Sequence, residues 1–167
     1  KSLNFIVKLA GRDAFGRDNA IAIVRIPRVL PRVIQLPPKV AGDKQAFVLL
    51  SSVVRAHLEA LFPGREIKAF SQFRLTRDTD LDVDEDDVTN LRQALRSKMS
   101  TRQFGQAVRL EVVASCPAEL SDFLLEQFVL LPDALYRVDG PVNLGRLTQL
   151  IDQADADHLR FEQYQAG

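Results

Sequence analysis

The stretch AVRLEVVA, residues 107–114, sets the fold class that the sequence predicts. Val108, Leu110 and Val112 alternate with charged residues, which is the two-residue period of a β-strand with one apolar face. Pro117 follows closely and suits the first position of a helix. The next residues place an apolar stripe at helical spacing, made of Leu120, Phe123, Leu124, Phe128 and Leu131. The pattern therefore predicts a strand followed by a helix.

Strand and helix patterns also alternate in the segments on either side of this stretch. Strands are predicted at 19–27, 32–36, 46–50, 67–76 and 136–138, and helices at 51–62, 84–99 and 143–152. The alternation slips at residues 70–72, which predicts a β-bulge there. The last helix is expected to face inward through Leu144, Leu147, Leu150 and Ile151. This order predicts an α+β fold with a mixed β-sheet and α-helices packed on it.

The stretch FRLTRDTDLDVDEDDV, residues 73–88, holds seven carboxylates between Asp78 and Asp87. A calcium loop would need glycine where Val83 stands and a bidentate glutamate where Thr89 stands. A catalytic carboxylate pair would need burial to separate the two pKa values, and seven clustered acids do not indicate burial. Acidic residues in the first turn of a helix are favourable because they cap free N–H groups and face the positive end of the dipole. We therefore interpret the stretch as a strand that leads into an acid-capped helix.

The reactive side chains form no convincing catalytic set. His57 is placed on a helix beside its apolar face, and His158 lies in a polar tail. Cys116 precedes a helix start, which can lower a thiol pKa, but no histidine is near it in sequence. These residues do not have the spacing of zinc ligands. The sequence thus predicts no catalytic, cofactor-binding or metal-binding residue.

The charge is unevenly distributed although the formal net charge of the 167 residues is zero. Residues 1–42 hold eight lysines and arginines against two aspartates. A basic surface attracts polyanions, and the predicted contact residues are Arg25, Arg28, Arg32, Arg74 and Arg77. The alternative is that opposite charges meet within the fold. Nucleic-acid binding is not indicated, because the chain has no basic run, aromatic-rich strand pair or zinc spacing.

Bulk composition is that of a globular domain, with 46% hydrophobic and 26% charged residues. No apolar run approaches the 18 residues of a transmembrane helix. A single cysteine fits a reducing compartment, which predicts a cytoplasmic location. The start at Lys1 suggests a segment of a longer protein.

Six stretches in one order carry a resemblance to a known family. They are KSLNFIV (1–7), RIPRVLPRVIQLP (25–37), FVLLSSVVRAHLEALFPG (47–64), FRLTRDTDLDVDEDDV (73–88), VRLEVV (108–113) and YRVDGPVNLGRLTQL (136–150). Together they closely resemble the middle, or head, domain of bacterial polyphosphate kinase. The resemblance implies an architecture similar to that of a phosphohistidine phosphatase, which is an analogy of fold that transfers no chemistry.

The family transfers the γ-phosphate of ATP reversibly to polyphosphate through a phosphohistidine. The resemblance implies that its nucleophilic histidine and Mg²⁺-binding residues lie in C-terminal catalytic domains, whose motifs do not occur in this chain. This segment would then bind no cofactor, while the parent enzyme would use Mg²⁺ and ATP. The segment would serve dimerisation and the architecture of the active-site tunnel. Two alternatives are a polyanion-binding module that uses the basic N-terminal half and an autonomous phosphohistidine enzyme that uses His57.

The resemblance also implies how the chain is divided and what it meets. Residues 1–18 would end the connection from an N-terminal domain, 19–152 would form the head domain, and 153–167 would lead to the first catalytic domain. The expected partners are the catalytic domains of the same enzyme and a second subunit, with polyphosphate as a further ligand. No nucleic acid or transmembrane segment is expected. The location would be cytoplasmic, or peripheral to the inner membrane as part of the parent enzyme.

Overall fold

The computed structural model describes residues 3–12, 16, 20–78 and 105–162, which form two compact units. The first unit combines Lys1–Val29 with Leu58–Asn143, and the second combines Leu30–His57 with Leu144–Gly167. The predicted head domain, 19–152, includes parts of both units, and its boundaries stay predictions. The predicted helix at 84–99 and most of the acidic stretch lie outside the described residues.

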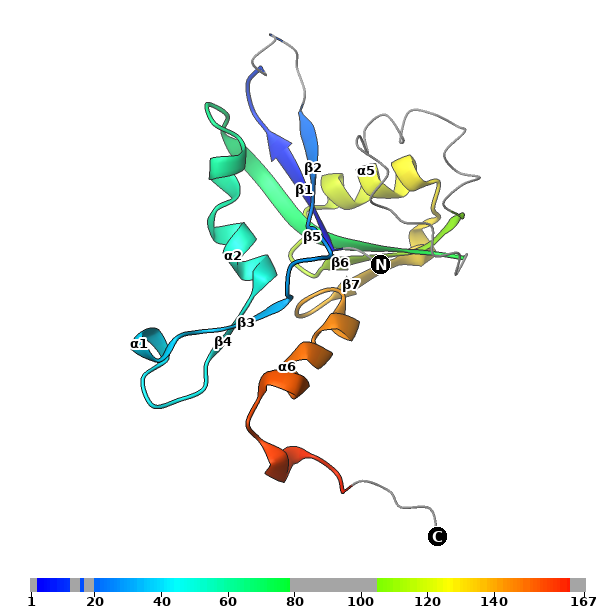
Figure 1. Cartoon of the computed structure of the whole chain (residues 1–167). Helices are drawn as coiled ribbons and strands as arrows, with labels where there is room; N and C mark the ends of the chain where they lie inside the picture. Colours follow the sequence, from blue (N-terminus) through cyan, green and yellow to red (C-terminus); the bar gives the residue numbers. More distant parts are fainter. Residues whose placement is uncertain (1–2, 13–15, 17–19, 79–104, 163–167) are drawn as a thin grey trace. The chain divides into compact units, whose positions relative to one another are not determined.

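A five-stranded sheet in the order β2-β1-β5-β6-β7 forms the first unit. Its strands are β1 (Asn4–Leu9), β2 (Ile21–Arg25), β5 (Ile67–Arg77), β6 (Ala107–Val113) and β7 (Leu135–Val138). Neighbouring strands are antiparallel except for β6 and β7, which are parallel and are connected through α5 (Ala118–Phe128). Figure 1 shows α5 lying across one face of this sheet. The prediction of an α+β fold with a mixed sheet is confirmed.

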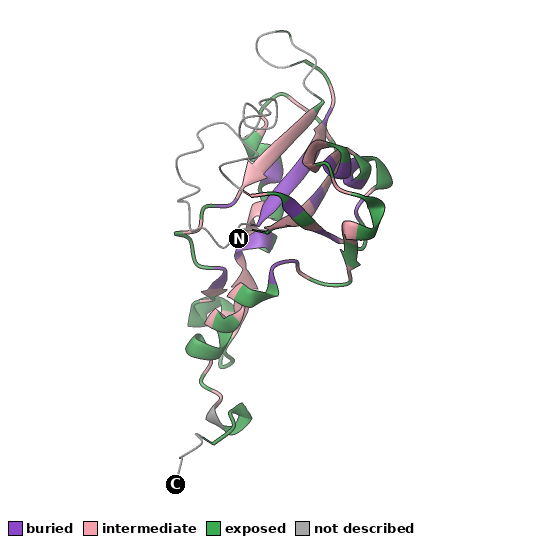
Figure 2. Ribbon diagram, turned by 90° about the vertical axis from the view of Figure 1, so that its right-hand side faces the viewer, coloured by how far each residue is buried: buried purple, intermediate pink, exposed green. Residues whose placement is uncertain are grey.

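The inner strand β1, which lies between β2 and β5, is not predicted from the sequence, where no strand is expected before residue 19. Phe5, Ile6 and Val7 are all fully buried, so both faces of β1 are covered. A strand that is buried on both faces reads as a continuous apolar run and lacks the alternation that identifies a half-buried strand. In Figure 2 the buried residues concentrate along the strands of this sheet.

The predicted bulge at residues 70–72 is wrong. The pairing of β5 is regular there, and its register shifts lie opposite Lys8 and Leu9 and again between Thr76 and Arg77. Alternation is interrupted near Phe70 because both faces of the sheet are apolar at that point. The Phe70 ring lies 6.5 Å from the ring of Phe5, centroid to centroid, on the face away from α5.

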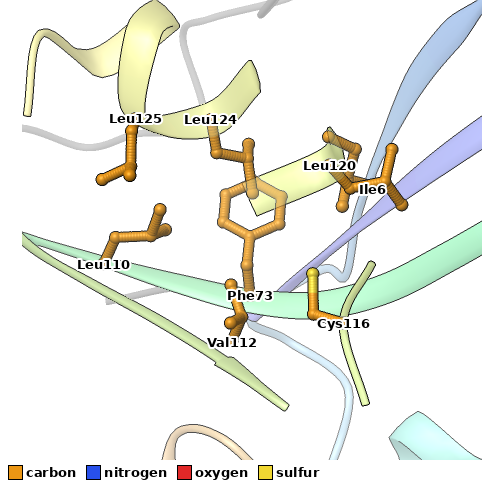
Figure 3. Packing of buried hydrophobic residues seen from close by; sticks show 8 residues of the cluster. All are labelled: Ile6, Phe73, Leu110, Val112, Cys116, Leu120, Leu124 and Leu125. Carbon is orange, nitrogen blue, oxygen red and sulfur yellow. The ribbon is translucent and has the colours of Figure 1, made fainter. Parts of the chain in front are cut away.

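The main hydrophobic cluster lies between the sheet and α5. Leu120 and Leu124 of the helix are fully buried and meet Phe73 of β5 and Leu110 of β6. Figure 3 shows the Phe73 ring directed towards α5, among these leucines. The predicted inward positions are confirmed for Leu120 and Leu124, which are buried, and for Phe123 and Phe128, which pack against the cluster. Leu125 also belongs to the buried cluster.

Both ends of α5 differ slightly from the prediction. Pro117 has ψ 139°, so it is the N-cap and the helix begins at Ala118. The helix ends at Phe128 because Val129 adopts the left-handed conformation, with φ 55° and ψ 47°. Leu131 therefore falls outside the helix and is 71% exposed, so its predicted inward position is wrong.

A two-stranded antiparallel sheet of β3 (Val33–Gln35) and β4 (Phe47–Leu49) forms the centre of the second unit. Its helices are α1 (Pro38–Ala41), α2 (Leu50–Ala56), α6 (Thr148–Gln153) and the 3-10 turns η4 (Leu144–Arg146) and η5 (Asp157–Leu159). The strands predicted at 32–36 and 46–50 are confirmed. The amide of Arg32 donates to Oε1 of Gln149 at 2.7 Å, which ties β3 to α6.

Two predicted helices are shorter than expected. The helix predicted at 51–62 ends at Ala56, and the 3-10 turn η1 (Leu58–Leu61) follows in the first unit. The helix predicted at 143–152 is divided into η4 and α6 after Asn143, which has φ 64°. Leu144, Leu150 and Ile151 are exposed, so the predicted inward face is wrong for these three residues.

Leu124→Ala is expected to lower the free energy of unfolding by about 3 kcal/mol, because it removes a fully buried side chain and leaves a cavity beside Phe73. Urea unfolding followed by circular dichroism measures the change. The matched control is Leu131→Ala, an exposed leucine, for which we expect a change below about 0.5 kcal/mol. Equal effects of the two substitutions would contradict the packing described for α5.

Val129→Gly is expected to raise the free energy of unfolding by about 1 kcal/mol, because a β-branched residue is strained in the left-handed region. Because Val129 is 85% exposed, removal of its side chain loses few packing contacts. Glu126→Gly, in the body of the same helix, should lower the free energy of unfolding by about 1 kcal/mol. Destabilisation by both substitutions would disprove the strain at Val129.

Burial raises the pKa of the Cys116 thiol, and Ser71 and Arg137 offset only part of that shift. The folded state therefore binds this proton more tightly than the unfolded state. We expect the thiol to leave stability unchanged below about pH 8.5 and to reduce it at higher pH. Thermal midpoints between pH 7 and 9.5 should fall further for the native sequence than for Cys116→Ala, and parallel curves would contradict the shift.

Candidate functional site

The five arginines predicted to contact a polyanion belong to different segments of the two units. Arg25 lies in the edge strand β2, and Arg28 follows that strand in the first unit. Arg32 belongs to the second unit and is buried, with 4% exposure. The prediction that these residues contact a polyanion stays a prediction, and the burial of Arg32 does not favour it.

The remaining two predicted arginines lie on opposite faces of the sheet. Arg74 alternates with Phe73 of the core and so points away from α5. Arg77 follows the register shift after Thr76 and lies 6.0 Å from the centroid of the Phe128 ring of α5. Its Nη1 also donates to the carbonyl of Gly105 at 2.9 Å. Because the two arginines are three positions apart on one strand, the alternation of β5 places them on opposite faces.

The sheet face away from α5 brings together two arginines around one carboxylate. Glu111 of β6 pairs directly with Arg74 of β5, and Arg109 lies two residues before Glu111 on the same face. Nη1 of Arg74 is 3.2 Å from Oε2 of Glu111, and Nη2 of Arg109 is 2.9 Å from Oε1. Each oxygen of Glu111 therefore accepts from a different guanidinium.

Tyr136 of β7 extends this group by one strand. It is the direct neighbour of Glu111 in the parallel pairing of β6 and β7. The guanidinium carbon of Arg109 lies 3.9 Å from the centroid of the Tyr136 ring, a cation–π contact. We call Arg74, Arg109, Glu111 and Tyr136 the arginine–glutamate row.

Several polar atoms of this face are buried without a hydrogen-bond partner among the described residues. They are Nε of Arg74, Nε of Arg109 and Oε1 of Gln72. The side chain of Glu111 is 11% exposed and that of Arg74 is 21% exposed, whereas 42% of the Arg109 side chain is exposed. Two positive charges thus share one nearly buried negative charge, and the excess charge reaches solvent through Arg109.

Such an arrangement can bind anions, and its one carboxylate, Glu111, is engaged by both arginines. A guanidinium presents five donors in a fixed plane that matches carboxylate and phosphate oxygens. Only one ion-pair contact to Glu111 is made by each arginine. The row is therefore a candidate anion-binding site.

The candidate reactive residues are not members of the row, and both histidines belong to the second unit. His57 is the exposed C-cap of α2, so the prediction of a place beside the apolar face of a helix is wrong. His158 is exposed in η5. Cys116 is buried on the α5 side of the sheet, where its carbonyl accepts from Nη1 of Arg137 at 2.7 Å. Within the described ranges, no group of three His, Cys, Asp or Glu side chains could hold a metal ion.

Sequence reasoning identified Arg74 but not the group to which it belongs. Alternation places Arg109 and Glu111 together on one face of β6, which is the available signal. The match of Glu111 with Arg74 depends on strand register, and the match with Tyr136 depends on β7 lying parallel to β6. Neither pairing can be read from spacing along the chain.

Comparison with known proteins agrees with this fold. The sequence model of the family described as polyphosphate kinase middle domain matches residues 1–150. A polyphosphate kinase from Neisseria meningitidis serogroup C is 52% identical over 167 residues, which are all of this chain and 24% of that protein. One from Pseudomonas aeruginosa is 55% identical over 161 residues, covering 96% of this chain and 23% of that protein.

A solved structure gives the same result for the fold. The crystal structure of polyphosphate kinase from Porphyromonas gingivalis matches 99% of this chain and 22% of its own, with a TM-score of 0.66 and 19% identity. The chain spans about a quarter of the length of the curated relatives it matches. No helix among the described residues is long and apolar enough to cross a membrane. The match of the family model to 150 of the 167 residues shows that this chain belongs to the polyphosphate kinase middle-domain family.

Proposed function

We propose that this chain is the non-catalytic head domain of a polyphosphate kinase and that it supports subunit contact and the shape of the active-site tunnel. The observation that carries the proposal is the match of the whole chain to about a quarter of relatives that are named polyphosphate kinase. In this proposal ATP and Mg²⁺ bind to catalytic domains outside this chain. The partners are those domains and a second subunit, and the whole enzyme is cytoplasmic.

The structure supports an architectural role through the rigidity of the first unit. The sheet is closed on one face by α5, and Phe73, Leu110, Leu120 and Leu124 are almost completely buried between them. Close-packed interiors of this kind resist deformation. A rigid sheet can hold other parts of an enzyme at fixed positions, which is what the walls of a tunnel require.

A second candidate function is binding of a polyanion, which the arginine–glutamate row favours. This site differs from the polyanion site predicted from the sequence. In the row Arg74 acts with Arg109, whereas the sequence grouped it with Arg77 and the arginines at 25, 28 and 32. The two functions can coexist, since a surface that shapes a tunnel can also bind what passes along it.

The chain by itself is expected to transfer no phosphate from ATP, because the reactive groups lie elsewhere in the enzyme. Acid-insoluble polyphosphate formed from radiolabelled ATP in the presence of Mg²⁺ provides the measurement. The intact polyphosphate kinase that contains this segment is the positive control. In that enzyme His57→Ala should leave the rate unchanged, because the imidazole is exposed at a helix end.

Polyphosphate synthesis by the isolated chain would refute the proposal, and so would covalent labelling of His57. Analytical ultracentrifugation over a range of concentrations tests subunit contact separately. A concentration-dependent dimer assigns that contact to this chain alone. A monomer at all concentrations would leave this chain only its role in tunnel shape and would remove intrinsic dimerisation from the proposal.

A further inference from the structure

We propose that the arginine–glutamate row is a binding site for the phosphate groups of an inorganic phosphate chain, with Arg109 as the principal contact and Arg74 as the second. The site lies on the face of β5, β6 and β7 that is turned away from α5. It does not depend on the chain having catalytic activity. The choice of phosphate as the anion rests on the proposed function.

Unused hydrogen-bonding capacity is the first argument for this site. Nη2 of Arg109 and Nη1 of Arg74 contact Glu111, and the Nε atoms of both arginines are buried without an acceptor among the described residues. Buried donors are normally paired, and each one that is not requires an explanation. Because these Nε atoms are buried, an anion that approached the row would bind the exposed part of the Arg109 side chain, whose guanidinium is only partly satisfied within the fold.

Preorganisation is the second argument. Arg109 is held from one side by Glu111 and from another by the Tyr136 ring, at 3.9 Å from its centroid. Stacking of this kind fixes the plane of the guanidinium, so little side-chain entropy is lost when an anion binds. With 42% of its side chain exposed, Arg109 is nevertheless accessible to solvent.

Incomplete charge compensation is the third argument. Glu111 neutralises only one of the two arginines, and no other carboxylate is recorded within ion-pair distance of Arg74 or Arg109 among the described residues. The face therefore keeps one excess positive charge in a partly desolvated setting. Glu111 also limits the affinity, because its negative charge lies next to the proposed ligand.

The negative charge of Glu111 allows a phosphate-binding site to be distinguished from a purely structural ion pair. Removal of an arginine should weaken phosphate binding, whereas removal of the negative charge by Glu111→Gln should strengthen it. If the row served only stability, neither change would alter the affinity for an anion once the folded fraction is taken into account. The two substitutions should thus move the affinity in opposite directions.

The test is titration of long-chain inorganic polyphosphate into the chain by calorimetry, at several salt concentrations. Arg109→Gln is expected to weaken binding about tenfold, by loss of charge-assisted hydrogen bonds, and to lower the salt slope by about one. Glu111→Gln is expected to strengthen binding about threefold. Lys68→Gln is the matched control, because it removes one positive charge from an exposed position on β5 itself, and it should change the affinity less than about twofold.

Circular dichroism of each variant establishes that it is folded, and Arg109→Lys provides a second measure. Lysine keeps the charge but lacks the planar donors of arginine. The affinity of Arg109→Lys for polyphosphate should therefore lie between those of the native chain and of Arg109→Gln. The proposal is overturned if Arg109→Gln weakens binding no more than Lys68→Gln, or if Glu111→Gln weakens it. Equal affinity for polyglutamate of matched charge would also overturn it, because the surface would then be assigned to an acidic protein segment.

Discussion

The pairing of β5 with β1 on one side and β6 on the other is the constraint on which the first unit depends. In this register Phe73 faces α5 and Arg74 faces away from it. A shift of one residue would exchange the two faces of the strand. It would bury Arg74 in the hydrophobic cluster and expose Phe73, which is 1% exposed in the folded chain. Burial of Phe73 therefore holds the charged face in position.

The two faces of the sheet are linked through their energetics as well as their geometry. On the α5 side, apolar burial supplies the stabilisation, at about 25 cal/mol for each Å² removed from water. On the other side Glu111 is nearly buried between Arg74 and Arg109, and such an arrangement gains little net stability because desolvation offsets the attraction. The charged row therefore adds little net stability to the sheet, in contrast to the apolar cluster on the opposite face.

Membership of the polyphosphate kinase middle-domain family places this chain within a larger architecture. The chain spans about a quarter of the length of the curated relatives it matches. Architecture and anion binding are compatible proposals, because they use different parts of the first unit. The hydrophobic cluster beneath α5 provides rigidity, and the opposite face carries the positive charge.

The sequence by itself determined the fold class, the strand at 107–113 with Leu110 and Val112 on its apolar face, the helix after Pro117 and the family. Val108, predicted on the same face, is 48% exposed beside the register shift. These features depend on periodicity, helix-start chemistry and the order of six motifs, all of which are local or linear. It did not reveal β1, because Phe5, Ile6 and Val7 are buried on both faces and so show no alternation. Nor did it place the bulges or the exposed face of α6, which depend on what each segment packs against.

The candidate site also belongs to the features that the sequence by itself did not reveal. Only the tertiary structure joined Arg74, Glu111 and Tyr136, because strand order and register bring together residues that lie 37 and 25 positions apart in the chain.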